Sequence, residues 1–130
     1  MRRKEKSLQK LVRVQKLMHD LAVWRHASIE HEKRTLEQGR AAAIEALGRD
    51  RTAYGALGAA AARYARRIET EIVGADERLS DAAHEALRQA ARAKIVSEAL
   101  SDARREVKEQ DGRKALAEIA DACLRTSKQA

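Results

Sequence analysis

The 130-residue sequence contains no proline, no phenylalanine, one tryptophan and two tyrosines. Proline is the strongest helix breaker, so its absence permits helices much longer than the globular average of about 11–12 residues. The scarcity of aromatic side chains removes the large groups that usually fill a globular core. Together these absences favour long helices over a compact globular domain.

Charged residues make up 36% of the chain, and alanine is prominent in the 44% that is hydrophobic. A sequence rich in Ala, Glu, Lys, Leu and Arg, with helical periodicity, is typical of coiled coils. Disorder is the competing interpretation, because many charges and few aromatics also fit a disordered chain. The apolar residues are periodic, however, and we therefore predict an all-α fold.

The cellular compartment is predicted from features that the sequence lacks. The single cysteine, Cys123, excludes an internal disulfide and suits a reducing compartment. No apolar run approaches the ~20 residues that span a bilayer, and no signal-peptide core follows the basic start. We expect a cytoplasmic protein, with peripheral association at the inner face of the cell membrane left open.

Positive charge is concentrated at the N-terminus. The net charge is +7, and residues 1–16 hold seven Lys and Arg against one acid, Glu5. Such a pole attracts an acidic protein, a phospholipid surface or nucleic acid. The alternative is a solvated, frayed helix start with no partner.

A first helix is expected over residues 4–73. Its apolar stripe recurs at steps of three and four: Leu8, Leu11, Val14, Met18, Leu21, Ala22, Ile29, Leu36, Ala43 and Leu47. The glycines of residues 48–58 weaken this helix, since each costs about 1 kcal/mol relative to alanine. We favour a thinned but continuous helix there, with a hinge or short loop as the alternative.

A turn is expected at residues 74–76, where Gly74 suits a helix end and Asp76 can cap the next helix. The second helix, residues 76–126, has clear heptads: Leu79, Ala82, Ala86, Ala93, Val96, Leu100, Ala103 and Val107, interrupted by Gln89 and Gln110. After Gly112 the apolar residues continue in a shifted phase. The prediction is one domain, an antiparallel coiled-coil hairpin whose first ~20 residues project beyond the partner helix.

No catalytic or metal-binding pattern is found in the sequence. His26 and His31 are five residues apart and so face different sides of a helix, and a His26–Glu30 pair is too few ligands for a metal. No phosphate-binding glycine loop is present. We expect a protein that is not an enzyme, has no metal or cofactor, and takes no small-molecule substrate.

Trp24, the only tryptophan, permits two interpretations. It either covers the end of the apolar stripe where the second helix stops, or anchors a partner, since tryptophan is enriched at binding hot spots.

The opening KSLQKLVRVQKLMHDLAVWRHASIE, with its Leu-x-x-Leu-x-x-Val core, runs into a long charged helix. It resembles the FliJ proteins of bacterial flagellar type III export and their YscO-like relatives in injectisomes. The resemblance implies an antiparallel helical hairpin like the stalk of rotary ATPases. It further implies a stalk that binds the hexameric export ATPase and escorts chaperones or substrates to the export gate.

The resemblance also implies which residues bind these partners. The ATPase contact would fall on Leu8, Leu11, Arg13, Val14 and Lys16, with Leu124 and Arg125 on the opposing helix. Tyr54 is the candidate for the gate contact, although its Gly/Ala-rich surroundings depart from the family pattern.

Three other classes stay open. A nucleic-acid-binding arm is disfavoured, because the basic stretch lacks aromatic stacking residues. A membrane-surface helix over residues 8–18 and a structural homo-oligomer are the remaining alternatives.

Overall fold

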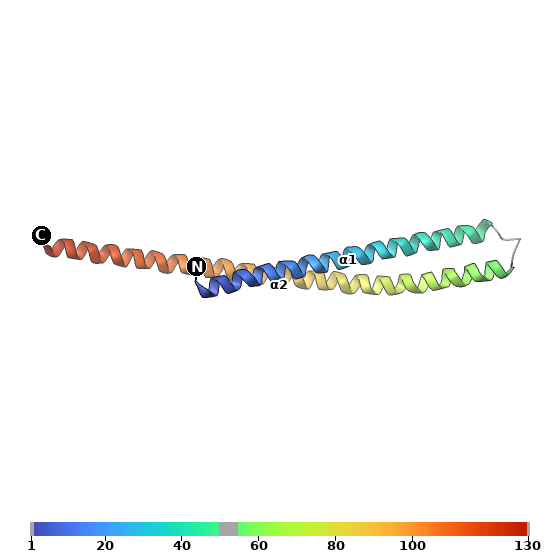
Figure 1. Ribbon diagram of the computed structural model, residues 1–130, viewed down its shortest axis with the longest axis horizontal. Coiled ribbons are helices and arrows are strands. Elements are labelled where there is room, and N and C mark those ends of the chain that lie inside the picture. The colour runs from blue at the N-terminus through green and yellow to red at the C-terminus, as the bar shows by residue number, and fades with distance from the viewer. Residues whose placement is uncertain (1, 50–54, 130) are drawn as a thin grey trace. The chain divides into compact units, whose positions relative to one another are not determined.

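The computed structural model describes residues 2–49 and 55–129, and all but the first of them lie in two helices. Helix α1 spans Arg3–Arg49 and helix α2 spans Gly55–Gln129 (Figure 1). The described part of the chain contains no strand. The predicted all-α fold is confirmed.

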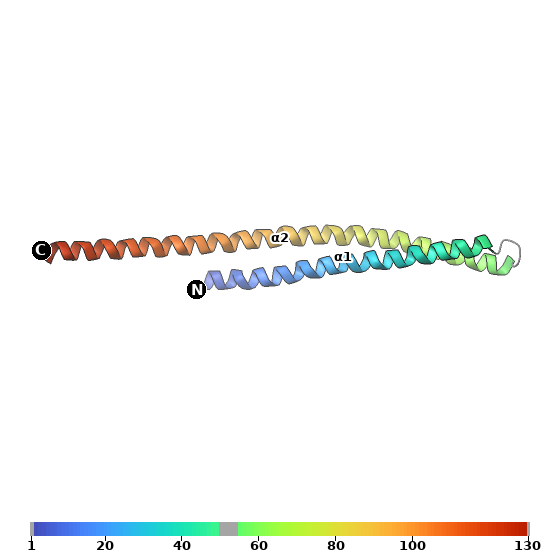
Figure 2. The same ribbon diagram turned by 90° about the horizontal axis from the view of Figure 1, so that it is seen from above.

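The chain divides into two compact units, which are described separately. Unit 1 combines Met1–Leu17 with Ala91–Ala130, and unit 2 is Met18–Ala90. In unit 2, α1 and α2 lie side by side (Figure 2). Ion pairs join Arg40 to Glu69 and Lys33 to Asp76, so lower-numbered residues of α1 meet higher-numbered residues of α2. This antiparallel order confirms the helical hairpin.

The seam of α2 follows the predicted heptads. Buried and half-buried residues recur at alternating steps of three and four, the spacing of a coiled-coil seam. They are Ala61, Ala65, Ile68, Ile72, Ala75, Leu79, Ala82, Ala86, Gln89, Ala93, Val96, Leu100, Ala103 and Val107. The heptads expected from Leu79 to Val107 are therefore confirmed, and they begin more than two heptads earlier.

The turn predicted at residues 74–76 is wrong, because α2 continues through Gly74 without interruption. The seam passes from Ile72 to Ala75 and Leu79 with no change of phase. Gly74 has no left-handed backbone conformation, and a Cβ added to it would meet nothing within 4 Å. Packing of the seam residues Ile72 and Ala75 on either side of Gly74 outweighs the roughly 1 kcal/mol that a glycine costs a helix.

The helix boundaries differ accordingly from those predicted. The first helix does not extend from residue 4 to residue 73, and the second does not begin at residue 76. Instead α1 ends at Arg49 and α2 begins at Gly55, both inside the predicted weak point at 48–58. The favoured continuous helix over 48–58 falls partly on residues 50–54, which lie outside the described residues, but the ion pair between Arg40 and Glu69 excludes one straight helix running from α1 into α2.

The seam of α1 is only partly the predicted stripe. The buried and half-buried positions with heptad spacing are Glu5, Leu8, Val12, Gln15, His19, Ala22, His26, Ile29, Lys33, Leu36, Arg40, Ala43 and Leu47. The prediction is confirmed for Leu8 and from Ala22 to Leu47. It is wrong for Leu11, Val14, Met18 and Leu21, all of which are exposed.

Ion pairs across the helices explain how so polar a seam is tolerated. In unit 2, the Lys33 ammonium lies 2.6 Å from the Asp76 carboxylate, and the Arg40 guanidinium lies 3.1 Å from the Glu69 carboxylate. The hydrogen bond that Lys33 donates to the Asp76 carboxylate raises the pKa of Lys33 above its usual value. Long cationic side chains cover apolar surface with their stems while their charged ends reach solvent, so they can occupy seam positions beside alanine.

Candidate functional site

Unit 1 brings the two terminal segments of the chain together. The Arg2 guanidinium lies 3.2 Å from Asp111, the Lys4 ammonium 3.7 Å from Glu106, and the Arg104 guanidinium 3.5 Å from Glu5. The N-terminal segment of α1 is thus paired with α2. The expectation that the first ~20 residues project beyond the partner helix is wrong, because these ion pairs place residues 2–5 beside residues 104–111 of α2.

It is the C-terminal segment of α2 that lies uncovered in unit 1. Every residue from Gln110 to Lys128 is exposed. Its large apolar side chains Leu116, Ile119 and Leu124 are 68%, 60% and 62% exposed. Because Arg2 pairs with Asp111, these residues follow the last ion pair between α1 and α2 in the described chain.

A shift in the position of the apolar residues explains this exposure. Continuing the α2 heptads beyond Val107 places Gln110, Lys114, Ala117, Asp121 and Leu124 at seam positions, and three of these five are polar. Leu116, Ile119 and Cys123 lie off these positions, in the shifted phase that the sequence predicts after Gly112. Part of the apolar surface of this segment therefore lies outside the seam that α2 shares with α1 and is available to a different partner.

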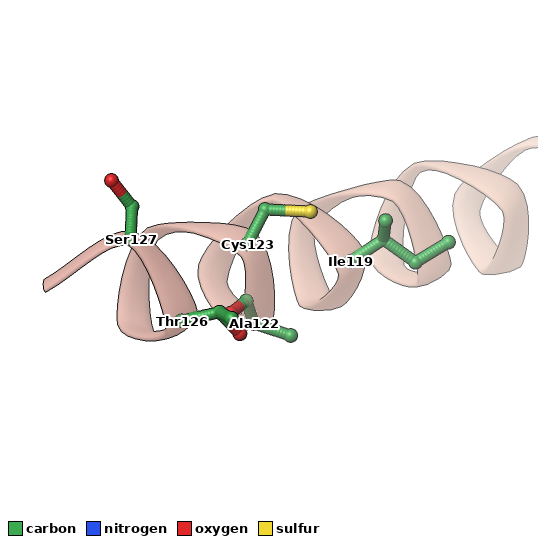
Figure 3. A pocket seen from close by; sticks show the side chains of 5 residues that line it. All are labelled: Ile119, Ala122, Cys123, Thr126 and Ser127. Carbon is green, nitrogen blue, oxygen red and sulfur yellow. The ribbon is translucent and has the colours of Figure 1, made fainter. Parts of the chain in front are cut away.

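Part of this face forms a shallow hollow on a single helix. Ile119, Ala122, Cys123, Thr126 and Ser127 line it. Figure 3 shows the Cys123 sulfur directed along the helix toward Ile119. The surface is apolar and carries a free thiol, and no group from α1 lines it.

The net positive charge belongs entirely to unit 1. It holds 16 Lys and Arg and 8 Asp and Glu, for a net charge of +8, whereas unit 2 holds 11 and 12, for −1; together these give the +7 of the chain. In the part of α1 that belongs to unit 1, five exposed cations make no ion pair with any described residue: Arg3, Lys6, Lys10, Arg13 and Lys16. These charges are therefore available to an anionic partner.

The predicted partner-binding residues differ in how far they are exposed. Leu8 lies in the seam and is half-buried. The other α1 candidates are exposed: Leu11, Arg13, Val14, Lys16 and Trp24. On α2, Leu124 is exposed and Arg125 lies 3.1 Å from Asp121 of the same helix. Tyr54 lies outside the described residues.

The register of the helices and the exposure of Trp24 each exclude part of what the sequence predicts. Leu124 and Arg125 do not face the α1 candidates across the seam, because the register pairs the start of α1 with residues 104–111. Trp24 is 65% exposed, so it does not cover the end of the stripe. Leu116 and Ile119 were absent from the predicted site, although polar Lys114 and Asp121 at seam positions could have indicated their exposure.

The histidines are not grouped. His19 lies 3.9 Å from Asp20, and His26 lies 3.8 Å from Glu30. His84 contacts the Ser80 carbonyl oxygen through Nδ1 at 2.7 Å. Within residues 2–49 and 55–129, no three His, Cys, Asp or Glu side chains are close enough to hold a metal ion.

Neither helix, over its described residues, has a stretch apolar enough to cross a bilayer. Comparisons with protein-family models, with curated proteins and with solved structures gave no match to the chain.

Proposed function

We propose that this chain is a non-enzymatic component of the bacterial flagellar type III export apparatus. It acts as a coiled-coil stalk that binds the hexameric export ATPase and escorts chaperones or substrates to the export gate. The proposal places the protein in the cytoplasm. The resemblance to FliJ supplies the identity of these partners, and the geometry of unit 1 supplies the surface that would bind them.

The observation that carries the proposal is the uncovered apolar face of α2 beyond Asp111. Leu116, Ile119 and Leu124 are each at least 60% exposed on a helix that has no seam partner there. Contiguous exposed apolar side chains on a soluble helix mark a protein interaction site. Leu116, Ile119 and Cys123 are spaced by three and four residues, the steps used by an amphipathic helix that lays one face into a partner's groove.

The cations of α1 in the same unit support the proposal. Arg13 and Lys16 are exposed and make no ion pair with a described residue. Exposed positive charge speeds association with an acidic surface and fixes its orientation. The proposed ATPase contact therefore rests on the apolar face of the C-terminal segment, and these cations, which lie farther along unit 1, would attract an acidic partner.

Binding of the purified full-length chain to the export ATPase of the same cell tests the proposal. We expect Leu116→Ser combined with Ile119→Ser to weaken binding at least about tenfold, because burying each such side chain contributes roughly 1.5–3 kcal/mol. The matched control is Val73→Ser combined with Leu87→Ser, which removes similarly exposed side chains from unit 2. The control variant should bind as the unmodified chain does.

Point variants are preferable to deletion of the N-terminal segment. Residues 2–5 pair with α2, so their removal would also uncover the seam. If the full-length chain does not bind the ATPase, the proposal is wrong. If the Leu116/Ile119 variant binds normally while Arg13→Glu with Lys16→Glu abolishes binding, the contact lies on α1 alone.

Nucleic-acid binding is the second candidate, favoured by the +8 charge of unit 1. It predicts an affinity that falls steeply with salt, because each phosphate contact releases counterions. Against it, residues 1–17 contain no aromatic side chain on which a base could stack. Titration of labelled DNA and RNA at two salt concentrations separates this candidate from the first.

A further inference from the structure

A second apolar surface runs along α1, outside the seam. We name it the α1 outer stripe; its members are 42–69% exposed and comprise Leu11, Val14, Leu17, Met18, Leu21 and Trp24. All six follow one another in a single helix, so their common face is set by helix periodicity. The hairpin covers the seam face of α1 and leaves this face bare.

The stripe is too short to form another coiled-coil strand. Its core, Leu11, Val14, Met18 and Leu21, occupies the same two heptad positions in two successive heptads. The equivalent positions before it are Lys4 and Ser7, and those after it are Arg25 and Ser28. Coiled-coil pairing is indicated by apolar residues at these two positions sustained over at least about three to four heptads. A second copy of the chain or a partner helix would therefore find little seam to pair with.

Unpaired cations border the stripe along its N-terminal half. Lys6, Lys10, Arg13 and Lys16 are exposed and make no ion pair with any described residue. Acidic side chains are absent from residues 6–19 of the sequence. Because no protein group fixes these charges in place, they suit a diffuse anionic surface better than one precisely spaced set of carboxylates.

We propose that the α1 outer stripe binds an anionic phospholipid surface, with α1 lying in the plane of the membrane. Leucine, valine and methionine side chains would enter the boundary between headgroups and acyl chains, and the cations would meet the lipid phosphates. Trp24 ends the stripe, and tryptophan side chains favour this interfacial depth. This binding shares the cations Arg13 and Lys16 with the proposed contact with the export ATPase, but it uses a different apolar surface.

Trp24 also provides the measurement, because it is the only tryptophan in the chain. The full-length chain is titrated with vesicles of phosphatidylcholine and with vesicles that also contain phosphatidylglycerol. We expect the Trp24 emission to shift to shorter wavelength only with the anionic vesicles, and the shift to decrease with salt. Flotation of the same mixtures checks that protein and lipid move together.

Two matched pairs of variants test the surface. Leu17→Ser is compared with Leu87→Ser, since these side chains are 69% and 70% exposed, and Arg13→Glu is compared with Arg66→Glu. We expect each α1 variant to lower the affinity for anionic vesicles several-fold, because one surface cation contributes about a factor of five and one leucine more. The Leu87 and Arg66 variants should bind within twofold of the unmodified chain. Circular dichroism confirms that all four remain helical.

Several outcomes would overturn the lipid proposal. They are no emission shift with anionic vesicles, an equal shift with phosphatidylcholine alone, or equal losses in a variant and its control. An emission shift produced by the export ATPase but not by vesicles would assign the stripe to a protein instead. The vesicle assay contains no ATPase, and the Leu116→Ser, Ile119→Ser variant should retain vesicle binding, so failure of one proposal is distinguishable from failure of the other.

Discussion

Arg78 of α2 donates two hydrogen bonds to the Glu32 carboxylate of α1, at 2.9 and 3.0 Å. This bidentate pair joins the two helices within unit 2, at the edge of the seam. The hydrogen bond from Arg78 lowers the pKa of Glu32 below its ordinary value of 4.5. The same bond raises the pKa of Arg78. Paired charges of this kind tie one residue of α1 to one residue of α2 and so help to specify the register.

The lowered pKa of Glu32 predicts a stability that depends on pH. A carboxyl group with a lower pKa in the folded state stabilises that state above its unfolded pKa, and this stabilisation is lost as pH falls through the folded pKa. Glu32→Gln should therefore lower the Tm slightly at neutral pH, and the difference from the unmodified chain should shrink as the pH falls below 4.5 and vanish below the lower pKa of the folded state. The effect is small and sensitive to salt, because both side chains are about half exposed.

Thermal unfolding by circular dichroism at several pH values measures this difference. Glu77→Gln is the control, because Glu77 is exposed and makes no ion pair with any described residue. A Glu32→Gln difference that grows as the pH falls would contradict the prediction.

A substitution in the seam should lower the free energy of unfolding much more than a substitution outside it. Ile72 is 5% exposed, and its neighbour Val73 is 54% exposed. Ile72→Ala should lower the free energy of unfolding by about 2 kcal/mol or more, since it removes buried methyl groups and leaves a cavity. Val73→Ala should change it by less than about 0.5 kcal/mol. Urea unfolding compares the two variants, and equal effects would contradict the assigned seam.

Gly74→Ala tests where the hairpin turns. In the interior of α2, alanine at this position should raise the free energy of unfolding by about 0.5–1 kcal/mol, because a glycine is lost from a helix and the added methyl group meets nothing within 4 Å. If Gly74 instead ended a helix in a left-handed conformation, the same substitution would destabilise the chain. The sign of the change in Tm decides between the two.

The seam of α2 could be predicted from the sequence because its members are mostly apolar. Leu79, Leu100 and Val107 mark the heptads, and alanines fill most of the positions between them. The position of the turn could not be predicted in this way. Gly74 and Asp76 form a plausible helix boundary, yet Ile72, Ala75 and Leu79 keep one phase across it. Continuity of phase was the stronger signal, because each seam residue is stabilised by the facing helix.

The seam of α1 was harder to predict because its outer face is the more apolar one near the N-terminus. Leu11, Val14 and Leu21 give a cleaner apolar period than the true seam, which includes His19 and Lys33. Lys33 is tolerated there because Asp76 lies 2.6 Å away on α2. That pairing depends on the register of the hairpin, and the turn predicted at residues 74–76 implies a different register.

A turn predicted near residue 75 also predicts the wrong terminal segment to be uncovered. With a turn near residue 75, the N-terminal segment was expected to be bare; with the helices meeting as observed, Arg2 pairs with Asp111. The predicted partner-binding residues are cationic and apolar side chains on helical faces, and their binding of a partner stays a prediction. Which of them are covered follows from long-range pairing and could not be read from local periodicity.

Hydrogen exchange should distinguish the C-terminal segment of α2 from the seam. Backbone amides of a helix without tertiary packing open locally, because most helical stability in water comes from a packed face. Amides of residues 112–128 should therefore exchange much faster than those of residues 93–107, whose side chains include the buried Leu100 and Ala103. Mass spectrometry of peptic fragments measures both segments in one experiment. Adding a partner that binds the C-terminal segment should slow exchange there and leave residues 61–79 unchanged. Strong protection of residues 112–128 in the isolated chain would show that this face is already covered, and would remove the main support for its role in partner binding.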